Sequence, residues 1–120
     1  MVIDDEAAIL RLAGEVLRHG GYTVLSAASA SEAVQLDQTN HARLRLVLTD
    51  IMMPFGDGRH LITMLYEQDP RLPIIAMSGL ATPEFQQETP RRGAHAFVRK
   101  PFSAEELLRV LASALAQKPG

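Results

Sequence analysis

Residues 44–54 read LRLVLTDIMMP, a mostly apolar run that ends at Asp50 and is followed by a loop with a proline. An apolar run of about four to eight residues bounded by turn signals is typical of a strand buried on both faces, as in parallel sheets. Four other short runs have the same character, and longer segments separate them. The runs that we predict as strands are 1–3, 22–25, 44–48, 74–77 and 94–98.

The longer segments have the period of amphipathic helices. In the first, apolar residues recur at three- and four-residue spacing from Ile9 to Leu17, and Gly20 supplies a stop. The third helix is predicted over residues 59–68, and Pro70 ends it. These segments are long enough to connect parallel strands.

Local capping signals place the other three helices. Serine precedes glutamate by three residues at Ser29 and at Ser103, so capping boxes open the second and the last helix. Thr82 followed by proline predicts the start of a fourth helix, which Pro90 must stop or kink. We therefore expect five helices, of which the fourth is the loosest.

Five strands that alternate with five helices predict an α/β fold: a doubly wound parallel sheet between two helical layers. We assign residues 1–120 to a single domain, since no linker, repeat or low-complexity stretch divides them. In such sheets ligands bind at the carboxyl ends of the strands, where the strand order reverses. The loops after the strands are therefore where chemistry is expected.

Composition excludes several classes of protein. Twelve basic and 14 acidic side chains leave a net charge of −2, which argues against general binding to nucleic acid. No apolar run approaches the ~20 residues that span a bilayer, and early acidic residues exclude a signal peptide, so we expect a cytoplasmic domain without membrane contact. The absence of cysteine excludes disulfide scaffolds, thiolate zinc sites and cysteine nucleophiles.

Polar residues follow four of the predicted strands. They are Asp4, Asp5, Asp50, Ser78 and Lys100. Each alone is ordinary in a loop, but several carboxylates held at one sheet edge require a cation or a proton to compensate them. Hard oxygen ligands without histidine or cysteine select Mg²⁺ or a similar ion. A metal ion beside a carboxylate and a lysine is the arrangement that phosphoryl transfer requires, and Asp50 could act as its nucleophile.

The choice of lysine at position 100 supports this interpretation. The chain contains ten arginines and only two lysines, Lys100 and Lys118. A compact ammonium group fits a tight site where a broad guanidinium group does not, and it can contact first a carboxylate and then a phosphoryl oxygen.

Over essentially all of its 120 residues the chain resembles the receiver domains of two-component response regulators and hybrid histidine kinases. The matching pieces are the pair Asp4-Asp5, residues 48–54 followed by Gly58, residues 77–79 and residues 100–102. The resemblance implies a flavodoxin-like three-layer sandwich with strand order 2-1-3-4-5. It also implies that Asp50 accepts a phosphoryl group from a phosphohistidine.

The resemblance further implies a role for each site residue. Asp5 and Asp50 would bind Mg²⁺ directly, Met52 would add its backbone carbonyl, and Asp4 would act through water. Ser78 would hydrogen-bond the phosphoryl group, and Lys100 would pair with it next to a cis peptide bond to Pro101.

Phosphorylation adds about two negative charges, toward which Ser78 would move while Phe97 turns inward as the switch. An ordinary core position for Phe97 is equally compatible with the sequence. The expected signalling surface comprises the fourth helix, the fifth strand and the fifth helix. The expected partners are a histidine kinase or phosphotransfer domain as donor and an output domain or protein, with a homodimer left open.

Two features depart from the family pattern. Only residues 1–3 precede the first acids, so we expect the first strand to be truncated and the chain to be cut from a longer protein, a hybrid sensor kinase in preference to a stand-alone regulator. Pro90 interrupts a helix that signalling usually employs, which leaves the output mechanism open.

Two other functions share parts of this pattern. A magnesium-dependent phosphohydrolase of the haloacid-dehalogenase type needs a second acid two residues after its aspartate, where this chain has Met52. A flavin-binding electron carrier needs a phosphate-binding loop after the first strand, where this chain has acids. The four histidines, among them His41 and His95, show no metal-ligand spacing and are expected to be structural or at the surface.

Overall fold

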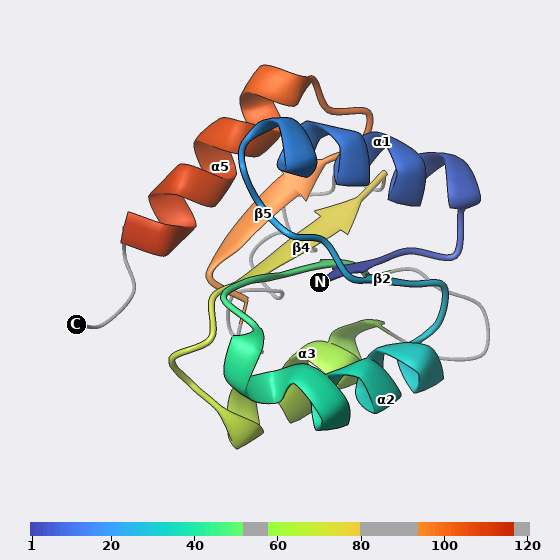
Figure 1. Ribbon diagram of the computed structural model, residues 1–120, viewed down its shortest axis with the longest axis vertical. Helices are drawn as coiled ribbons and strands as arrows, with labels where there is room; N and C mark the ends of the chain where they lie inside the picture. Colours follow the sequence, from blue (N-terminus) through green and yellow to red (C-terminus); the bar gives the residue numbers. More distant parts are fainter. Residues whose placement is uncertain (52–57, 80–93, 117–120) are drawn as a thin grey trace.

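The computed structural model describes residues 1–51, 58–79 and 94–116. Five parallel strands form one sheet in the order β2-β1-β3-β4-β5, which confirms the predicted topology (Figure 1). The strands are β1 (Val2–Ile3), β2 (Ser26–Ala27), β3 (Val47–Asp50), β4 (Ile74–Ser78) and β5 (Ala96–Arg99). β1 therefore lies inside the sheet, between β2 and β3.

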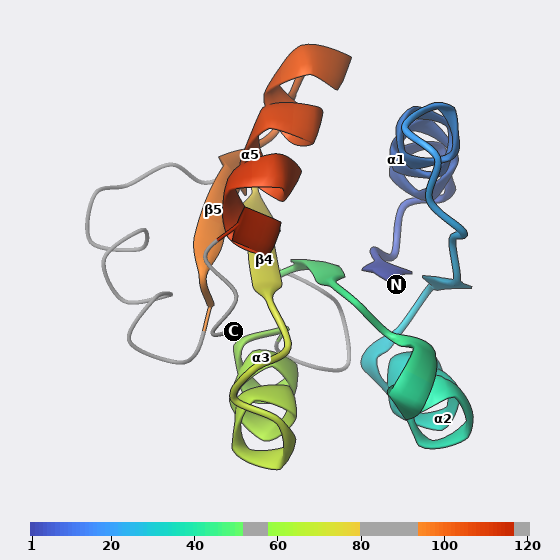
Figure 2. The same cartoon turned by 60° about the vertical axis from the view of Figure 1, so that its left-hand side comes forward.

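Helices cover both faces of the sheet. They are α1 (Ala7–His19), α2 (Ala30–Asn40), the short 3₁₀ helix η1 (His41–Arg43), α3 (Gly58–Gln68) and α5 (Ala104–Ala116). Figures 1 and 2 show α1 and α5 on one face and α2 and α3 on the other. The described residues thus contain four α-helices instead of the five predicted, because the helix predicted from Thr82, with Pro90 in it, lies outside them.

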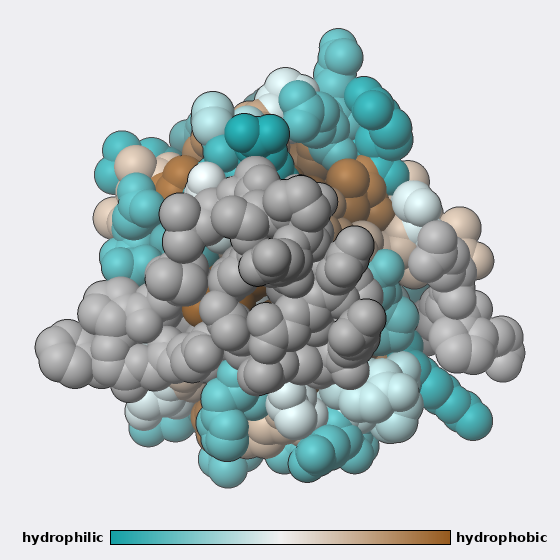
Figure 3. Space-filling model, turned by 180° about the vertical axis from the view of Figure 1, so that it is seen from behind, coloured by the Kyte–Doolittle hydropathy of each residue, from teal (hydrophilic) through white to brown (hydrophobic). Residues whose placement is uncertain are grey.

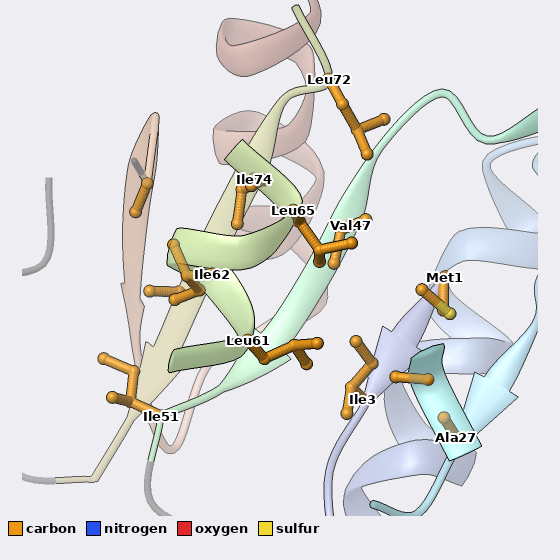
Figure 4. Close-up of a cluster of buried hydrophobic side chains, with 13 residues drawn as sticks. Met1, Ile3, Ala27, Val47, Ile51, Leu61, Ile62, Leu65, Leu72 and Ile74 are labelled. Atoms are coloured by element: carbon orange, nitrogen blue, oxygen red, sulfur yellow. The ribbon is translucent and has the colours of Figure 1, made fainter. Parts of the chain in front are cut away.

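Each face of the sheet has its own apolar core. Val2, Leu48 and Ile75 pack with α1 and α5, whereas Ile3 and Ile74 pack with α2 and α3. Figure 4 shows the second core, where side chains of α3 lie against those of β3 and β4. Alternate residues of a strand point to opposite faces of the sheet. Because helices cover both faces, most strand residues are buried, which explains why the strands are almost wholly apolar.

The outer faces are more polar. Seen from behind, the described surface is largely hydrophilic, with small hydrophobic areas between (Figure 3). Among the described residues no helix has the length and hydrophobicity that crossing a membrane requires.

The helix ends follow the predicted signals. α1 ends at a glycine pair in which Gly21 has a φ of 93°, and the amide of Tyr22 donates to the Leu17 carbonyl, as expected of a left-handed helix terminus. The Ser29 and Ser103 hydroxyl oxygens accept from the amides three residues later, at 3.1 Å in both helices. The capping predictions are confirmed at these two positions.

Three predicted strands were placed too early. β2 was predicted at residues 22–25 but begins at Ser26, because its pairing with β1 begins where Ser26 meets Val2. β3 was predicted at 44–48 but spans Val47–Asp50, since η1 occupies the residues before Leu44 and pairing with β4 starts at Val47.

The last strand shows the same error. β5 was predicted at 94–98 and spans Ala96–Arg99, because its pairing with β4 begins where Ala96 meets Ile75. Hydrophobicity found the buried segments, but the pairing register fixed their ends.

Candidate functional site

Three aspartates meet at the carboxyl edge of the sheet. Asp4 and Asp5 follow β1, and Asp50 is the last residue of the neighbouring strand β3. One carboxylate oxygen from each lies within 4.8 Å of the other two. Asp4 and Asp50 are buried and Asp5 is exposed. The structure thus brings together the three acids that the sequence placed at this edge.

Lys100, directly after β5, reaches across to this cluster. Its Nζ lies 2.6 Å from Asp4 Oδ2 and 3.2 Å from Asp50 Oδ2, and its side chain is only 12% exposed. Three carboxylates and one ammonium group carry a formal charge of −3 + 1 = −2. The lysine therefore neutralises only part of the negative charge gathered here.

The protonation of Lys100 is secured by its neighbours. Burial acts to lower its pKa, but the hydrogen bond to Asp4 and the charges of Asp50 and Asp4 outweigh burial, so the pKa of Lys100 is raised above its usual value. At neutral pH the side chain is a fixed positive charge beside two carboxylates.

Ser78 lies next to the cluster on the sheet. It is the buried last residue of β4, one position beyond Met77, which pairs with Asp50. Its carbonyl accepts a hydrogen bond of 2.9 Å from the Lys100 amide. The ends of β3, β4 and β5 are thus held in register, and Ser78 stands between the aspartate and the lysine strands.

Glu6 also belongs to this site, although it is not among the residues predicted from the sequence. Its amide donates a 2.9 Å hydrogen bond to Asp4 Oδ1, and its carboxylate lies 3.8 Å from Lys100 Nζ. An aspartate that accepts from the amide two residues later forms an Asx turn, a frequent pattern before a helix. An aspartate two residues before Glu6, directly ahead of a predicted helix, is the sequence feature from which this turn and the position of Glu6 could have been predicted.

The remaining predicted site residues have different outcomes. Met52 lies outside the described residues. Phe97 in β5 is partly buried against the core that contains α2 and α3. The Lys100–Pro101 peptide is cis, as the sequence resemblance implied.

Comparison with known proteins matches this arrangement to one family. The family model described as the response regulator receiver domain matches residues 1–112. This chain belongs to the receiver domain family. The crystal structure of the receiver domain of NtrX from Brucella abortus superposes with a TM-score of 0.89 at 33% identity and covers 97% of each chain.

Curated relatives contain this receiver domain as one part of longer proteins. The sensor kinase CckA of Brucella abortus is 32% identical over 107 residues, which is 89% of this chain and 11% of that protein. The response regulator FleR of Pseudomonas aeruginosa is 30% identical over 121 residues, which is 100% of this chain and 25% of that protein. The chain thus spans a quarter or less of these two relatives.

Family membership defines the general function. This receiver domain is a phosphoacceptor of two-component signalling, and receiver domains are signalling domains, not turnover enzymes. Receiver domains generally bind Mg²⁺ at an acidic cluster, and this one has such a cluster of aspartates. A phosphodonor such as a kinase is implied as a partner.

Proposed function

We propose that Asp50 is the phosphoacceptor of this receiver domain. The observation that supports it most is the pairing of a buried Asp50 carboxylate with Lys100 at 3.2 Å, beside two further carboxylates. Asp50 Oδ attacks phosphorus as the bond from phosphorus to the donor histidine nitrogen breaks, and the electron pair of that bond stays on the imidazole. The product is an acyl phosphate on Asp50.

The acidic cluster fits a divalent cation. Its donors are hard carboxylate oxygens, and its net charge is negative even with Lys100 counted, so a divalent cation would be attracted to it. Asp4 Oδ2 is buried, and Lys100 Nζ lies 2.6 Å from it. In this proposal Asp5 and Asp50 bind the ion directly, and Asp4 acts through water.

Met52 adds its backbone carbonyl in the same proposal, from a position outside the described residues. The ion supplies neutralisation of charge on the transferred phosphoryl oxygens.

Lys100 and Ser78 complete the proposed site. The ammonium group of Lys100, now shared by Asp4 and Asp50, moves part of its pairing to a phosphoryl oxygen. The Ser78 hydroxyl donates to a second phosphoryl oxygen. Phe97 of β5, partly buried against the core that contains α2 and α3, is proposed to follow the movement of Ser78 and so to report phosphorylation.

The partners and location of the whole protein are proposals of the same kind. A histidine kinase or phosphotransfer domain supplies the phosphoryl group, and an output domain or protein receives the signal, in the cytoplasm. We propose a hybrid sensor kinase as the parent, supported by the match to a sensor kinase, although response regulators match equally well. The full-length gene tests this directly.

The acceptor is tested by incubating the chain with acetyl phosphate and measuring its intact mass, with and without Mg²⁺. The parent should gain one phosphoryl group only with Mg²⁺, and Asp50→Asn should gain none. Asp69→Asn, which removes a carboxylate at the other end of the sheet, serves as the matched control and should be labelled like the parent. If Asp50→Asn is labelled as strongly as Asp69→Asn, the assigned acceptor is wrong.

A further inference from the structure

Glu6 lies at the junction between the aspartate cluster and the first helix. It is the N-cap residue of α1, with an extended main chain at φ −91° and ψ 116°. The side chain of an N-cap residue usually accepts a hydrogen bond from an amide in the first turn, but Glu6 makes no such bond within the described part of the chain. Its amide donates to Asp4 Oδ1 at 2.9 Å, which holds residue 6 beside the cluster. Glu6 therefore contributes its carboxylate to the site instead of to the helix.

Three carboxylates of the described residues contact the ammonium group of Lys100. Its Nζ lies 2.6 Å from Asp4 Oδ2 and 3.2 Å from Asp50 Oδ2, both within hydrogen-bond distance. Glu6 Oε1 lies at 3.8 Å, which is beyond hydrogen-bond distance but within that of an ion pair. The Asp4 and Asp50 side chains are almost fully buried, whereas that of Glu6 is 62% exposed. Glu6 is thus the weakest and the most accessible of the three partners.

Phosphorylation at Asp50 changes which of these charges are compensated. In the proposed function a divalent cation compensates the aspartates, and Asp50 becomes part of an acyl phosphate. Glu6 is left as the one uncompensated carboxylate among the described residues that contact Lys100. The arriving phosphoryl group adds about two negative charges. Glu6 therefore repels that group and competes with it for the same ammonium.

We propose that Glu6 is a positioning residue that acts through Lys100: its carboxylate retains part of the ammonium charge and so slows the transfer of a phosphoryl group to Asp50. The same negative charge attracts Mg²⁺ to the neighbouring aspartates. The Glu6 charge thus has opposite effects on phosphorylation and on ion binding. This inference rests on the proposed function of Asp50. An exposed ion pair changes a rate or an equilibrium by up to about fivefold, so Glu6 modulates the reaction and is not required for it.

Glu6→Gln tests the charge because it keeps the size of the side chain. Acetyl phosphate releases acetate as its phosphoryl group passes to Asp50, and the initial rate of labelling is measured by intact mass at saturating Mg²⁺. Glu6→Gln should be labelled about threefold faster than the parent. In a calorimetric titration with Mg²⁺ alone, it should bind the ion about twofold more weakly. Glu105→Gln, at an exposed acid of α5, should match the parent in both measurements.

The opposite directions separate an effect of charge from damage to the fold. A distorted start of α1 would displace the aspartates, so it would slow labelling and weaken Mg²⁺ binding together. Because the Glu6 side chain is 62% exposed, salt should also reduce its effect, and the ratio of the two labelling rates should fall toward one between about 0.05 M and about 1 M NaCl. Glu6→Asp, which keeps the charge, should be labelled at nearly the rate of the parent.

Any of three results overturns the role of Glu6: a labelling rate of Glu6→Gln no higher than that of the parent, an affinity for Mg²⁺ that is unchanged or tighter, or a higher rate that salt leaves unaltered. The acceptor is judged separately in the same assay. If the parent is labelled and Asp50→Asn is not, the acceptor stands, and a failure concerns Glu6 alone. If the parent is not labelled, or Asp50→Asn is labelled as strongly, both the acceptor and the role of Glu6 are overturned.

Discussion

The two ends of the sheet each hold a group of charged residues, and the two groups differ in how their carboxylates are arranged around a basic side chain. At the carboxyl end, Asp4, Asp5 and Asp50 converge within 4.8 Å and share Lys100. At the amino end of β3 and β4, His41 lies between two carboxylates that it keeps apart, with Nδ1 2.8 Å from Asp37 and Nε2 3.4 Å from Asp69.

The difference lies in charge balance and geometry. The three aspartates and Lys100 at the carboxyl end retain a formal charge of −2, which we propose a divalent cation from solution offsets. At the amino end, each ring nitrogen of His41 contacts one carboxylate, and the ring thereby links the end of α2 to the end of α3. Converging like charges make a binding site, whereas one bridging side chain makes a structural link. Four measurements examine this contrast.

Removal of Lys100 is expected to have the largest effect. Lys100→Met leaves the buried Asp4 and Asp50 without their cation, which should reduce the free energy of unfolding by about 3 kcal/mol in urea denaturation without Mg²⁺. Mg²⁺ should restore much of this loss. Arg71→Met, at an exposed arginine, should change stability by less than about 0.5 kcal/mol.

The pH dependence of that difference has a defined sign. The folded-state pKa of Lys100 is raised, so its stabilisation is present in full below its ordinary value of 10.5 and disappears as pH rises through the folded pKa. The difference between parent and variant should therefore be constant from pH 7 to pH 10, a range below that ordinary pKa. A variant as stable as the parent at pH 7 would contradict the compensating role of the lysine.

Asp5 allows metal binding to be separated from folding. Saturating Mg²⁺ at about 100 times its Kd should stabilise the parent by about 2.7 kcal/mol, and Asp5→Asn should lose most of this increment. Because Asp5 is exposed and its carboxylate lies within 4.8 Å of two others, its removal should not lower stability in the absence of Mg²⁺. Glu105→Gln, at an exposed acid of α5, should respond to Mg²⁺ as the parent does. An Asp5→Asn protein with full Mg²⁺ stabilisation would exclude this residue as a ligand.

Two glycines compare backbone constraint at the two ends. Gly21 has a φ of 93°, and Gly21→Ala should cost about 1 kcal/mol in thermal unfolding. Gly79, after β4, has no atom of the described residues within 4 Å of the place where a Cβ would lie, so Gly79→Ala should be neutral or stabilise slightly by reducing the freedom of the unfolded chain. Equal costs at both positions would refute this assignment of strain.

The smallest effect is expected at His41. The hydrogen bond to Asp37 is the largest cause and raises the pKa of His41. Burial opposes it, and the charges of Asp37 and Asp69 add to the rise, so the pKa lies above its ordinary value. Its stabilisation is present in full below the ordinary value of 6.5 and is lost as pH rises through the folded pKa.

His41→Gln should therefore lower stability more at pH 5.5 than at pH 8.5, by a few tenths of a kcal/mol, since the side chain is 40% exposed. His19→Gln, at an exposed histidine of α1, provides the control. An effect of His41→Gln that does not change with pH would show that the charge contributes nothing.

Most of the site could be predicted because its residues follow strands. The order of Asp50, Ser78 and Lys100 along the chain, together with parallel pairing, places them at one edge without knowledge of any distance. Local signals also sufficed for helix ends, since the Ser29 and Ser103 caps depend on residues three positions apart.

What the sequence could not supply depends on pairing over long range. The early placement of β2 and β3 arose because apolar residues such as Val24 and Leu46 pack in the core without lying in a strand. The link from Asp37 through His41 to Asp69 joins residues whose contact depends on how α2 and α3 pack. The hydrophobic pattern of the sequence predicts neither the strand pairing nor this link between helices.

The hydrogen bond between the Ser78 carbonyl and the Lys100 amide has a mechanical consequence. This bond joins the main chain of Ser78, whose hydroxyl group is proposed to donate a hydrogen bond to the phosphoryl group, to the main chain of Lys100, whose ammonium group is proposed to pair with it. Any displacement of the Ser78 main chain must either pull the Lys100 main chain with it or break a 2.9 Å bond. As long as this hydrogen bond holds, a displacement of the Ser78 main chain is therefore transmitted to the main chain at the end of the edge strand β5.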